Sequence, residues 1–425
     1  DGIRDIGVTG VQTCALPIFL LVRLLFLMFG DDTGMWEKGL FAEFIDARTA
    51  PDGSDLGAQL AHLFQVLDKE ETSRPAAIDE LLARFPYVNG HLFAERIDIP
   101  AFDRRMRDEL VTATKFDWGK ISPAVFGSLF QAIKSKEARR VLGEHYTTEA
   151  NIRKALGPLF LDDLWERFDA ARHHAKRLEQ LHEDIATIRV LDPACGCGNF
   201  LVVSYRQLRH LELNILKRLR ELTGDEQLHL DVAGLARVTI DHFYGIEIEE
   251  WPARIAETAL FLADQQANQE LALEFGRAPD RLPIRVAPTI RQADALRIDW
   301  NEVLPANKCT YVVGNPPFMG RKTRSKEETE ILKKCFDEAP GSGNIDYVCA
   351  WFARTAEYVE GARTRAALVA TNSITMGEQP SVLWEKLTKH KMGIDFAHQT
   401  FAWSSEAPGA AAVHVVIVGF SSVGT

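Results

Sequence analysis

The sequence predicts an α/β protein: a mostly parallel sheet with helices on both faces, preceded by an all-helical segment. Short apolar runs rich in β-branched residues begin near residue 186 and alternate with longer helical patterns, as in a parallel sheet. Residues from about 19 to 140 instead keep apolar residues at three- and four-residue steps, without a strand pattern between them. Polar residues directly follow several of the apolar runs, and the carboxyl ends of parallel strands are where such sheets bind ligands.

The composition narrows the class of protein further. The chain has 425 residues, is 46% hydrophobic and carries a net charge of −11, so it can bury one large core or two medium ones. This acidic balance excludes a uniformly basic nucleic-acid-binding surface, but it allows a local basic groove, because phosphate attraction depends on the patch. The six cysteines show neither zinc-site spacing nor the pattern of a secreted disulfide scaffold. We expect a cytoplasmic protein without a metal.

The N-terminal part contains two different kinds of sequence. Residues 1–18 have no periodicity and look like translated adapter sequence, so we interpret them as a non-native segment. Residues 18–30, IFLLVRLLFLMFG, are too short for a membrane span of about 20 apolar residues and are interrupted by Arg23. We expect a buried core helix there, no membrane segment, and a helical domain over residues 19–140 that includes LGAQLAHLFQVLD, AAIDELLARF and SPAVFGSLFQAI.

The first predicted strand, TIRVLD, runs into the turn DPACGCGNF. Gly196 and Gly198 allow the backbone to turn tightly, and a helix is expected to begin near Asn199, with free N–H groups at its N-terminus. Glycine-rich turns of this kind commonly bind dinucleotides, but the third glycine of that fingerprint is missing. Asp192 would also repel a pyrophosphate. The turn therefore favours a ligand with an ammonium group.

Two further acidic residues, Glu247 and Asp294, each have two interpretations. Glu247 follows the apolar run HFYGIEI and is placed to accept hydrogen bonds from ribose hydroxyls, or it is a solvated glutamate before a helix. Asp294, in RQADAL, is placed to bind an adenine amino group, or it is a helix N-cap. The residues alone favour neither interpretation at either position.

The strand CTYVVG leads to Asn315, Pro316, Pro317 and Phe318, before the apolar runs AALVAT and AVHVVIVGF. Both prolines fix φ near about −65°, so the Asn315 side-chain oxygen and the Pro316 carbonyl are held as adjacent acceptors. Two such acceptors would pull an exocyclic amine toward tetrahedral geometry and free its lone pair, while Phe318 stacks on a flipped base. The absence of a cysteine at this tip argues against a C5-cytosine mechanism. Outside this context, Asn-Pro-Pro is an ordinary loop stiffener.

These motifs together resemble the gamma-type adenine-N6 DNA methyltransferases, because GEHYTT at residues 143–148 precedes DPACGCGNF and the Asn-Pro-Pro-Phe tip. ALVATNSITMGEQ and FAHQTFAWSSEAPGAAAVHVVIVGF look closest to the methyltransferase region of MmeI-like type IIL restriction–modification enzymes. The resemblance implies a class I, Rossmann-like S-adenosylmethionine-dependent methyltransferase domain over residues 141–425, after a helical spacer. It also implies double-stranded DNA as the partner and base flipping during the reaction. The family's fused nuclease and target-recognition domains are not found in the sequence, so we expect a fragment without endonuclease activity.

The resemblance also assigns roles to individual residues. It implies that the catalytic tip is formed by Asn315, Pro316, Pro317 and Phe318. The cofactor would be bound by Tyr146, Thr147, Asp192, Pro193, Ala194, Cys195, Gly196, Gly198, Asn199, Phe200, Glu247, Ile248, Asp294, Ala295 and Asn315. Asp346 would shape the cofactor pocket, and the DNA would be contacted by Phe318, Arg321, Lys322 and Trp403. Arg321 and Lys322 belong to a basic run that also suits a solvated loop, and Trp403 also suits a core position.

Other functions remain open at this stage. The same tip would also suit methylation of the N4 amine of cytosine or of a glutamine side chain in a protein. Release-factor glutamine methyltransferases, however, lack the Tyr–Thr motif and a long helical spacer. A cofactor- or DNA-binding module without turnover is a different class, and so is a nicotinamide oxidoreductase, against which the missing third glycine counts.

Overall fold

The computed structural model describes residues 6–88, 91–122, 147–224, 236–276, 287–403 and 413–423, apart from the side chains of residues 6–17 and 91. The chain divides into two compact units. Unit 1 comprises Asp1–Pro123 and Phe261–Ala287, and unit 2 comprises Ala124–Leu260 and Pro288–Thr425. Helix α14 (Glu250–Phe275) contributes to both units.

The described residues of unit 1 form helices joined by turns and loops, without a strand. Its helices are α1 (Ile6–Thr33), α2 (Leu40–Arg48), α3 (Leu56–Leu67), α4 (Glu80–Ala83), α5 (His91–Ala94) and α6 (Arg104–Ala113), with the second part of α14. The apolar segment at residues 18–30 lies in α1, and Phe26, Leu27 and Phe29 are fully buried, which confirms the expected core helix. Among the described residues, no helix combines the length and the apolar character needed to cross a membrane.

The turn after α1 is organised by a buried carboxylate. Asp31 accepts hydrogen bonds from the Trp36 indole N–H at 2.7 Å and from the backbone N–H groups of Phe41 and Ala42 at 2.8 and 3.0 Å. These bonds satisfy free N–H groups in the first turn of α2. The side chains of Gln265 and Gln269 on α14 donate to the Thr33 carbonyl at 2.9 and 2.6 Å, so α14 joins the end of α1 within this unit.

Unit 2 is built on a seven-stranded sheet with the order β3-β2-β1-β4-β5-β7-β6. Its strands are β1 (Val190–Asp192), β2 (Phe243–Glu247), β3 (Thr289–Gln292), β4 (Tyr311–Gly314), β5 (Arg365–Thr371), β6 (Met392–Trp403) and β7 (Val413–Ser422). Pairs among β1 to β5 are parallel, whereas β7 runs antiparallel to both β5 and β6. The mostly parallel sheet confirms the predicted fold class. The strand order reverses between β1 and β4, which is where such sheets leave a crevice for a ligand.

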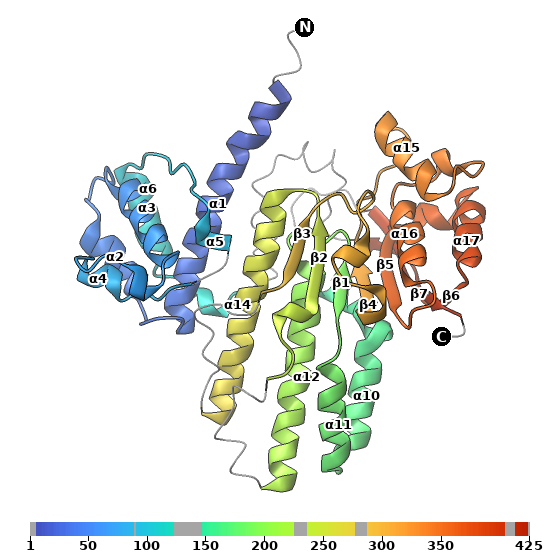
Figure 1. Cartoon of the computed structure of the whole chain (residues 1–425), viewed down its shortest axis with the longest axis horizontal. Helices are drawn as coiled ribbons and strands as arrows, with labels where there is room; N and C mark the ends of the chain where they lie inside the picture. Colours follow the sequence, from blue (N-terminus) through green and yellow to red (C-terminus); the bar gives the residue numbers. More distant parts are fainter. Residues whose placement is uncertain are drawn as a thin grey trace. The chain divides into compact units, whose positions relative to one another are not determined.

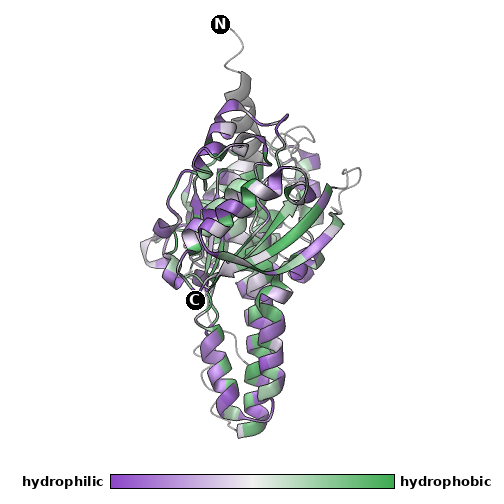
Figure 2. Cartoon of the chain, turned by 90° about the vertical axis from the view of Figure 1, so that its right-hand side faces the viewer, coloured by the Kyte–Doolittle hydropathy of each residue, from purple (hydrophilic) through white to green (hydrophobic). Residues whose placement is uncertain are grey.

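Helices cover the sheet in unit 2 (Figure 1). They are α9 (Glu149–Leu156), a π-helical turn (Gly157–Leu161), α10 (Asp162–Ala171), α11 (Ala175–Ile185), α12 (Asn199–Thr223), the first part of α14, α15 (Lys326–Cys335), α16 (Cys349–Val359) and α17 (Gln379–Lys389). Helix α12 contacts β1 and β2, while α16 contacts β5 and β7. In Figure 2 the strands are coloured as mainly hydrophobic, whereas the helices also carry hydrophilic faces.

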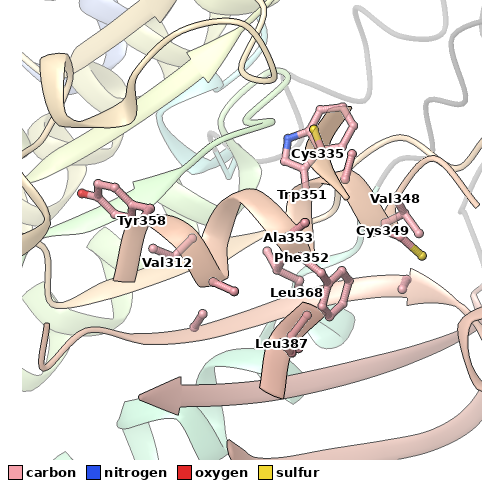
Figure 3. Packing of buried hydrophobic residues seen from close by; sticks show 14 of the residues in the cluster. Val312, Cys335, Val348, Cys349, Trp351, Phe352, Ala353, Tyr358, Leu368 and Leu387 are labelled. Carbon is pink, nitrogen blue, oxygen red and sulfur yellow. The ribbon is translucent and has the colours of Figure 1, made fainter. Parts of the chain in front are cut away.

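The core of unit 2 explains why the strand sequences are almost continuously apolar. Leu191, Val312 and Leu368 belong to one buried cluster with residues of α16 and α17, such as Phe352 and Leu387 (Figure 3). Their neighbours along the strands point to the opposite face because side chains alternate, and they are buried as well. A sheet buried on both faces has little room for polar side chains, except where its strands end.

Candidate active site

A cavity of about 410 Å³ opens at the carboxyl edge of the sheet in unit 2. Its lining includes the residues that end or follow β1 to β4, namely Asp192, Glu247, Asp294 and Asn315. These strands lie on the two sides of the point where the strand order reverses. The topology therefore collects four polar residues, far apart in the sequence, around one space.

The turn after β1 depends on glycine at two positions. Gly196 and Gly198 have φ angles of 53° and 82°, a region that side chains with a Cβ rarely adopt. A Cβ on Gly198 would lie 2.8 Å from the Cβ of Ala256 on α14, so the close approach of α14 also requires glycine. Asp192 closes the turn by accepting a hydrogen bond from the Ala194 N–H at 3.0 Å. As predicted, α12 begins at Asn199.

Glu247 at the end of β2 holds the same turn from the other side. Its two carboxylate oxygens accept hydrogen bonds from the N–H groups of Gly196 and Glu249 at 3.0 and 2.9 Å. The Cys195 N–H donates to the Ile246 carbonyl at 3.1 Å, which adds a backbone link between the two strand ends. Each carboxylate oxygen has a second lone pair, so Glu247 can still accept hydrogen bonds from a ligand.

The cavity is strongly acidic. Six acidic side chains and one basic side chain are found among its described lining residues: Asp192, Glu247, Glu249, Asp294, Glu327, Glu328 and Arg297. Burial, with a smaller contribution from the charge of Glu247, raises the pKa of Asp192 to about 8. The same surroundings suit a cationic ligand with hydroxyl groups and disfavour a ligand that carries phosphates.

Cys195 also lines this cavity, but its chemistry is unsuited to nucleophilic attack. Burial, followed by the charges of Asp192 and Glu247, raises the pKa of its thiol well above the usual value. Since the thiolate is the nucleophilic form, Cys195 is a small turn residue rather than an activated cysteine. Among the described residues, no group of His, Cys, Asp and Glu side chains could hold a metal ion.

Asp294 is already engaged by its own turn. One oxygen accepts from the Leu296 N–H at 2.9 Å and the other accepts from the Arg297 Nε at 2.9 Å, but residues 295–297 form a turn, so Asp294 does not cap a helix. Arg297 also pairs with Glu327 at the start of α15. Asp294, Arg297 and Glu327 thus form a series of ion pairs along one wall of the cavity. The carboxylate of Asp294 has further lone pairs that can accept hydrogen bonds from a ligand.

The Asn-Pro-Pro-Phe tip lies on the β4 side of the cavity, which Asn315 and Pro317 line. The Asn315 Nδ2 donates to the hydroxyl of Thr147 at 3.0 Å, although the two residues are 168 positions apart. Phe318 is half-buried and packs against the apolar cluster of the unit. The Tyr–Thr motif and the Asn-Pro-Pro-Phe tip therefore meet through Thr147, whereas Tyr146 lies outside the described residues.

The predicted site residues separate into two groups. Those that line the cavity are Thr147, Asp192, Pro193, Ala194, Cys195, Gly196, Asn199, Phe200, Glu247, Ile248, Asp294, Ala295, Asn315 and Pro317. Those that do not are Gly198, Pro316, Phe318, Arg321, Lys322 and Trp403.

The basic run after the tip is divided by burial. Arg321 and Lys322 are exposed, whereas Arg324 is buried and donates to the carbonyls of Ile345 and Gly343 at 2.7 Å each. Arg324 therefore holds the chain segment ahead of α16, whereas Arg321 and Lys322 are accessible to a partner. Trp403 is buried at the end of β6, with 2% of its surface exposed.

Tyr347 and Trp351 are among the lining residues that sequence reasoning missed. Both line the cavity, and the Trp351 indole N–H donates to the Pro193 carbonyl at 3.0 Å. In the sequence, Trp351 is one aromatic residue in an apolar helical pattern, which predicts only a core position. The backbone acceptor that it contacts gives no sequence signal.

The donor set fits S-adenosylmethionine, whose amino-acid part is cationic and whose ribose carries hydroxyls. Asp192 and Glu247 supply carboxylates, and the side-chain oxygen of Asn199 is buried without a hydrogen-bond partner within the described part of the chain. A volume of about 410 Å³ lies within the usual range of small-molecule pockets, about 300–1,000 Å³.

The strand order, the antiparallel β7 and the glycine turn at the sheet's reversal point are those of a class I methyltransferase fold. Residues 168–425 match the family described as the MmeI DNA-methyltransferase domain, and residues 16–93 match the MmeI helicase spacer domain. The chain belongs to this MmeI-type DNA-methyltransferase family, as its motifs suggested.

Two relatives are similar over almost the whole chain. A DNA methyltransferase A from Bacillus subtilis (strain 168) is 42% identical over 414 residues, which are 96% of this chain and 46% of that protein. The DNA-bound structure of the type IIL restriction–modification enzyme MmeI has 46% identity and a TM-score of 0.89, over 95% of this chain and 54% of that one. The chain thus spans about half the length of these relatives.

Proposed function

We propose that the protein transfers a methyl group from S-adenosylmethionine to the N6 amino group of adenine in duplex DNA, as part of a restriction–modification enzyme. The observation that carries this proposal is the position of the Asn-Pro-Pro-Phe tip. Asn315 lies on the lining of the same cavity as Asp192 and Glu247, with its amide nitrogen held by Thr147. A methyl donor and an extruded base amine can therefore meet at one place.

Each part of the cavity has a separate role in this proposal. Bound S-adenosylmethionine supplies an electrophilic methyl group on a sulfonium centre. Asp192 balances its ammonium group, while Glu247 accepts hydrogen bonds from its ribose hydroxyls. Asp294 accepts from its adenine amino group.

The catalytic tip acts on the other substrate. An adenine amine is a poor nucleophile because its lone pair is delocalised into the ring. Asn315 Oδ1 and the Pro316 carbonyl accept its two hydrogens and favour a tetrahedral nitrogen, while Phe318 stacks on the flipped base. The nitrogen forms a bond to the methyl carbon as the carbon–sulfur bond breaks, and the amine then loses one proton to solvent.

The partners of the whole enzyme are part of the same proposal. The exposed residues Arg321 and Lys322 follow the tip and would contact the DNA backbone. Trp403 is buried and does not line the cavity, so it would support the base site through packing and not through contact with the DNA. The relatives are about twice as long as this chain, which is consistent with fused nuclease and target-recognition domains in the complete enzyme. Residues 19–140 would serve as the spacer and 141–425 as the methyltransferase domain.

The chemistry can be tested without knowledge of the recognition site. The protein is incubated with S-adenosylmethionine and a random-sequence duplex pool, and the DNA is then digested to nucleosides for mass spectrometry. We expect N6-methyladenine, and Asn315→Ala should reduce its formation about 100-fold or more while it still binds the cofactor. If N4-methylcytosine is the only methylated nucleoside found, the target is cytosine and not adenine. Cofactor binding by calorimetry without any transfer would instead support a binding module.

A further inference from the structure

The Asn-Pro-Pro-Phe tip is fixed at both of its ends. It begins where β4 ends, and Gly314 is still paired in register with Leu368 of β5. It ends at Met319, whose N–H donates to Asp346 Oδ1 at 3.2 Å and whose carbonyl accepts from the Tyr347 N–H at 3.1 Å. Four residues with two prolines among them thus span a short distance between two anchored points, which leaves the tip little conformational freedom.

Asp346 is in turn held by several other elements. Its side chain is buried, and Oδ2 accepts from the hydroxyls of Thr371 at 2.9 Å and Ser373 at 3.3 Å, at the end of β5. Its backbone N–H donates to Gln379 Oε1 at 2.9 Å, at the start of α17. The anchor of the tip is therefore part of the rigid framework of the sheet, because its partners other than Met319 lie in or next to regular elements.

The same short segment also reaches the turn after β1. Trp351, in the first turn of α16, donates its indole N–H to the Pro193 carbonyl at 3.0 Å. Its ring is buried and belongs to the cluster that also contains Val348 and Phe352, so the indole is held by packing (Figure 3). Residues 346–351 therefore touch the loop before α12 and the loop after β4 at once.

We propose that residues 346–351 position the two halves of the active site relative to each other, with Asp346 setting the catalytic tip and Trp351 setting the cofactor turn. Neither residue need contact a reacting atom. Sites of this kind require positions accurate to well under 1 Å, and a framework residue with several hydrogen bonds supplies such accuracy. The kinetic consequences rest on the proposed function, whereas the mechanical tethering of the tip does not.

The competing interpretation is that Asp346 only stabilises the fold. Asp31 in unit 1 provides a matched control, because 6% of its surface is exposed against 7% for Asp346, and it also accepts hydrogen bonds from backbone N–H groups. Removing either carboxylate leaves buried donors without a partner and lowers the stability of the fold. A purely structural role predicts similar consequences for Asp31→Ala and Asp346→Ala.

The first test measures the tether without any substrate. Hydrogen exchange is followed in a peptide covering residues 315–324, in which the two prolines have no amide and Met319 is a direct reporter. We expect at least a tenfold faster exchange in Asp346→Ala, an intermediate rate in Asp346→Asn, which keeps one acceptor oxygen, and no change in Asp31→Ala. Unchanged protection in Asp346→Ala, in protein that is still folded by circular dichroism, would overturn the proposal.

The second test separates the two halves of the site by kinetics. Asp346→Ala should lower kcat about 10- to 100-fold and change the Kd for S-adenosylmethionine less than about twofold. Trp351→Phe keeps an aromatic ring but loses the donor, and should raise that Kd about 3- to 10-fold with kcat nearly unchanged at saturation. If both variants shift both parameters alike, the division of roles is wrong. If wild-type protein transfers no methyl group, the proposed function fails, while the exchange result still decides the tethering.

Discussion

At the scale of single residues, the contact between Thr147 and Asn315 decides which face of an amide is presented. A carboxamide carries an acceptor and a donor on opposite sides, and only the oxygen can accept a hydrogen from an amine. The Thr147 hydroxyl accepts from Asn315 Nδ2, so it fixes the nitrogen side. Thr147 was expected to help bind the cofactor, and its cavity position leaves that role open as a proposal.

This contact predicts a difference between two near-isosteric substitutions. Thr147→Val keeps the shape but removes the hydroxyl, so the Asn315 amide can rotate, and kcat should fall about tenfold or more. Thr147→Ser keeps the hydroxyl and should retain most of the activity. Single-turnover methyl transfer to DNA measures both, with cofactor affinity determined in parallel. Equal loss in both variants would show that the methyl group of Thr147, and not its hydroxyl, matters.

The sequence identified the polar residues of the site better than it identified their partners. Asp192, Glu247 and Asn315 each follow an apolar run directly, and the structure brings all three to one cavity. A strand end is visible in a sequence because the pattern changes there. The contacts of Thr147 and Trp351 join residues more than 150 positions apart, so no local pattern can indicate them.

At the scale of elements, helix α12 has glycine in the left-handed region at both ends. Gly198 at its start and Gly224 at its end have φ angles of 82° and 60°. A Cβ on Gly198 would lie 2.8 Å from the Cβ of Ala256, whereas no atom of the described part of the chain lies within 4 Å of a Cβ on Gly224. A side chain at Gly224 would therefore cause backbone strain alone, whereas a side chain at Gly198 would cause both backbone strain and a steric clash.

Alanine substitutions at these two glycines should have unequal effects. Gly224→Ala should cost about 1–2 kcal/mol of folding free energy, from backbone strain alone, and leave cofactor affinity unchanged. Gly198→Ala should cost about 1–3 kcal/mol more and weaken cofactor binding severalfold, because α14 or the turn must shift. Urea unfolding and calorimetric titration with S-adenosylmethionine measure the two effects. A Gly198→Ala variant that binds the cofactor normally would contradict the assigned close approach.

Strands were predictable in proportion to their burial. The strands β1, β2, β4, β5 and β7 are buried apolar runs, and each was recognised as a strand. Strand β3 lies at one edge with mostly exposed residues, and β6 lies at the other edge, with exposed positions and two irregularities in its pairing with β7. Both were missed because an edge strand buries too few side chains to impose an apolar pattern.

At the scale of the whole molecule, sequence order is a poor guide to which parts form one unit. The sequence placed the helix after β2 in the methyltransferase region, whereas its residues from Phe261 onward group with unit 1. A helix has the same apolar periodicity whichever partner it packs against, so the pattern cannot reveal such a division. The order of the strands across the sheet is likewise a property of topology, and only the family resemblance implied it.

The stability of the folded molecule should depend on pH through Asp192. Its pKa is about 8 in the folded protein, against roughly 3.9 for an unfolded chain, so the folded state binds the additional proton between these values. The unfolded state binds fewer protons in that window, and stability contributed by this group therefore falls as pH rises from about 4 to 8. The carboxylate to which the proposed function assigns a cationic ligand thus destabilises the ligand-free protein at the upper end of this window.

Asp192→Asn tests this conflict between function and stability directly. The carboxamide stays neutral, so the variant should be more stable than wild type by on the order of 5 kcal/mol at pH 8.5 and by only about 1–2 kcal/mol at pH 5. It should also bind S-adenosylmethionine at least tenfold more weakly, because the ammonium loses its counter-charge. Urea titrations at both pH values, without ligand, give the stability difference, and Glu249→Gln serves as a control at a less buried carboxylate of the same cavity. A difference between Asp192→Asn and wild type that does not grow with pH would show that the Asp192 carboxyl is already ionised in the folded protein, and that the cavity is preformed for a cation.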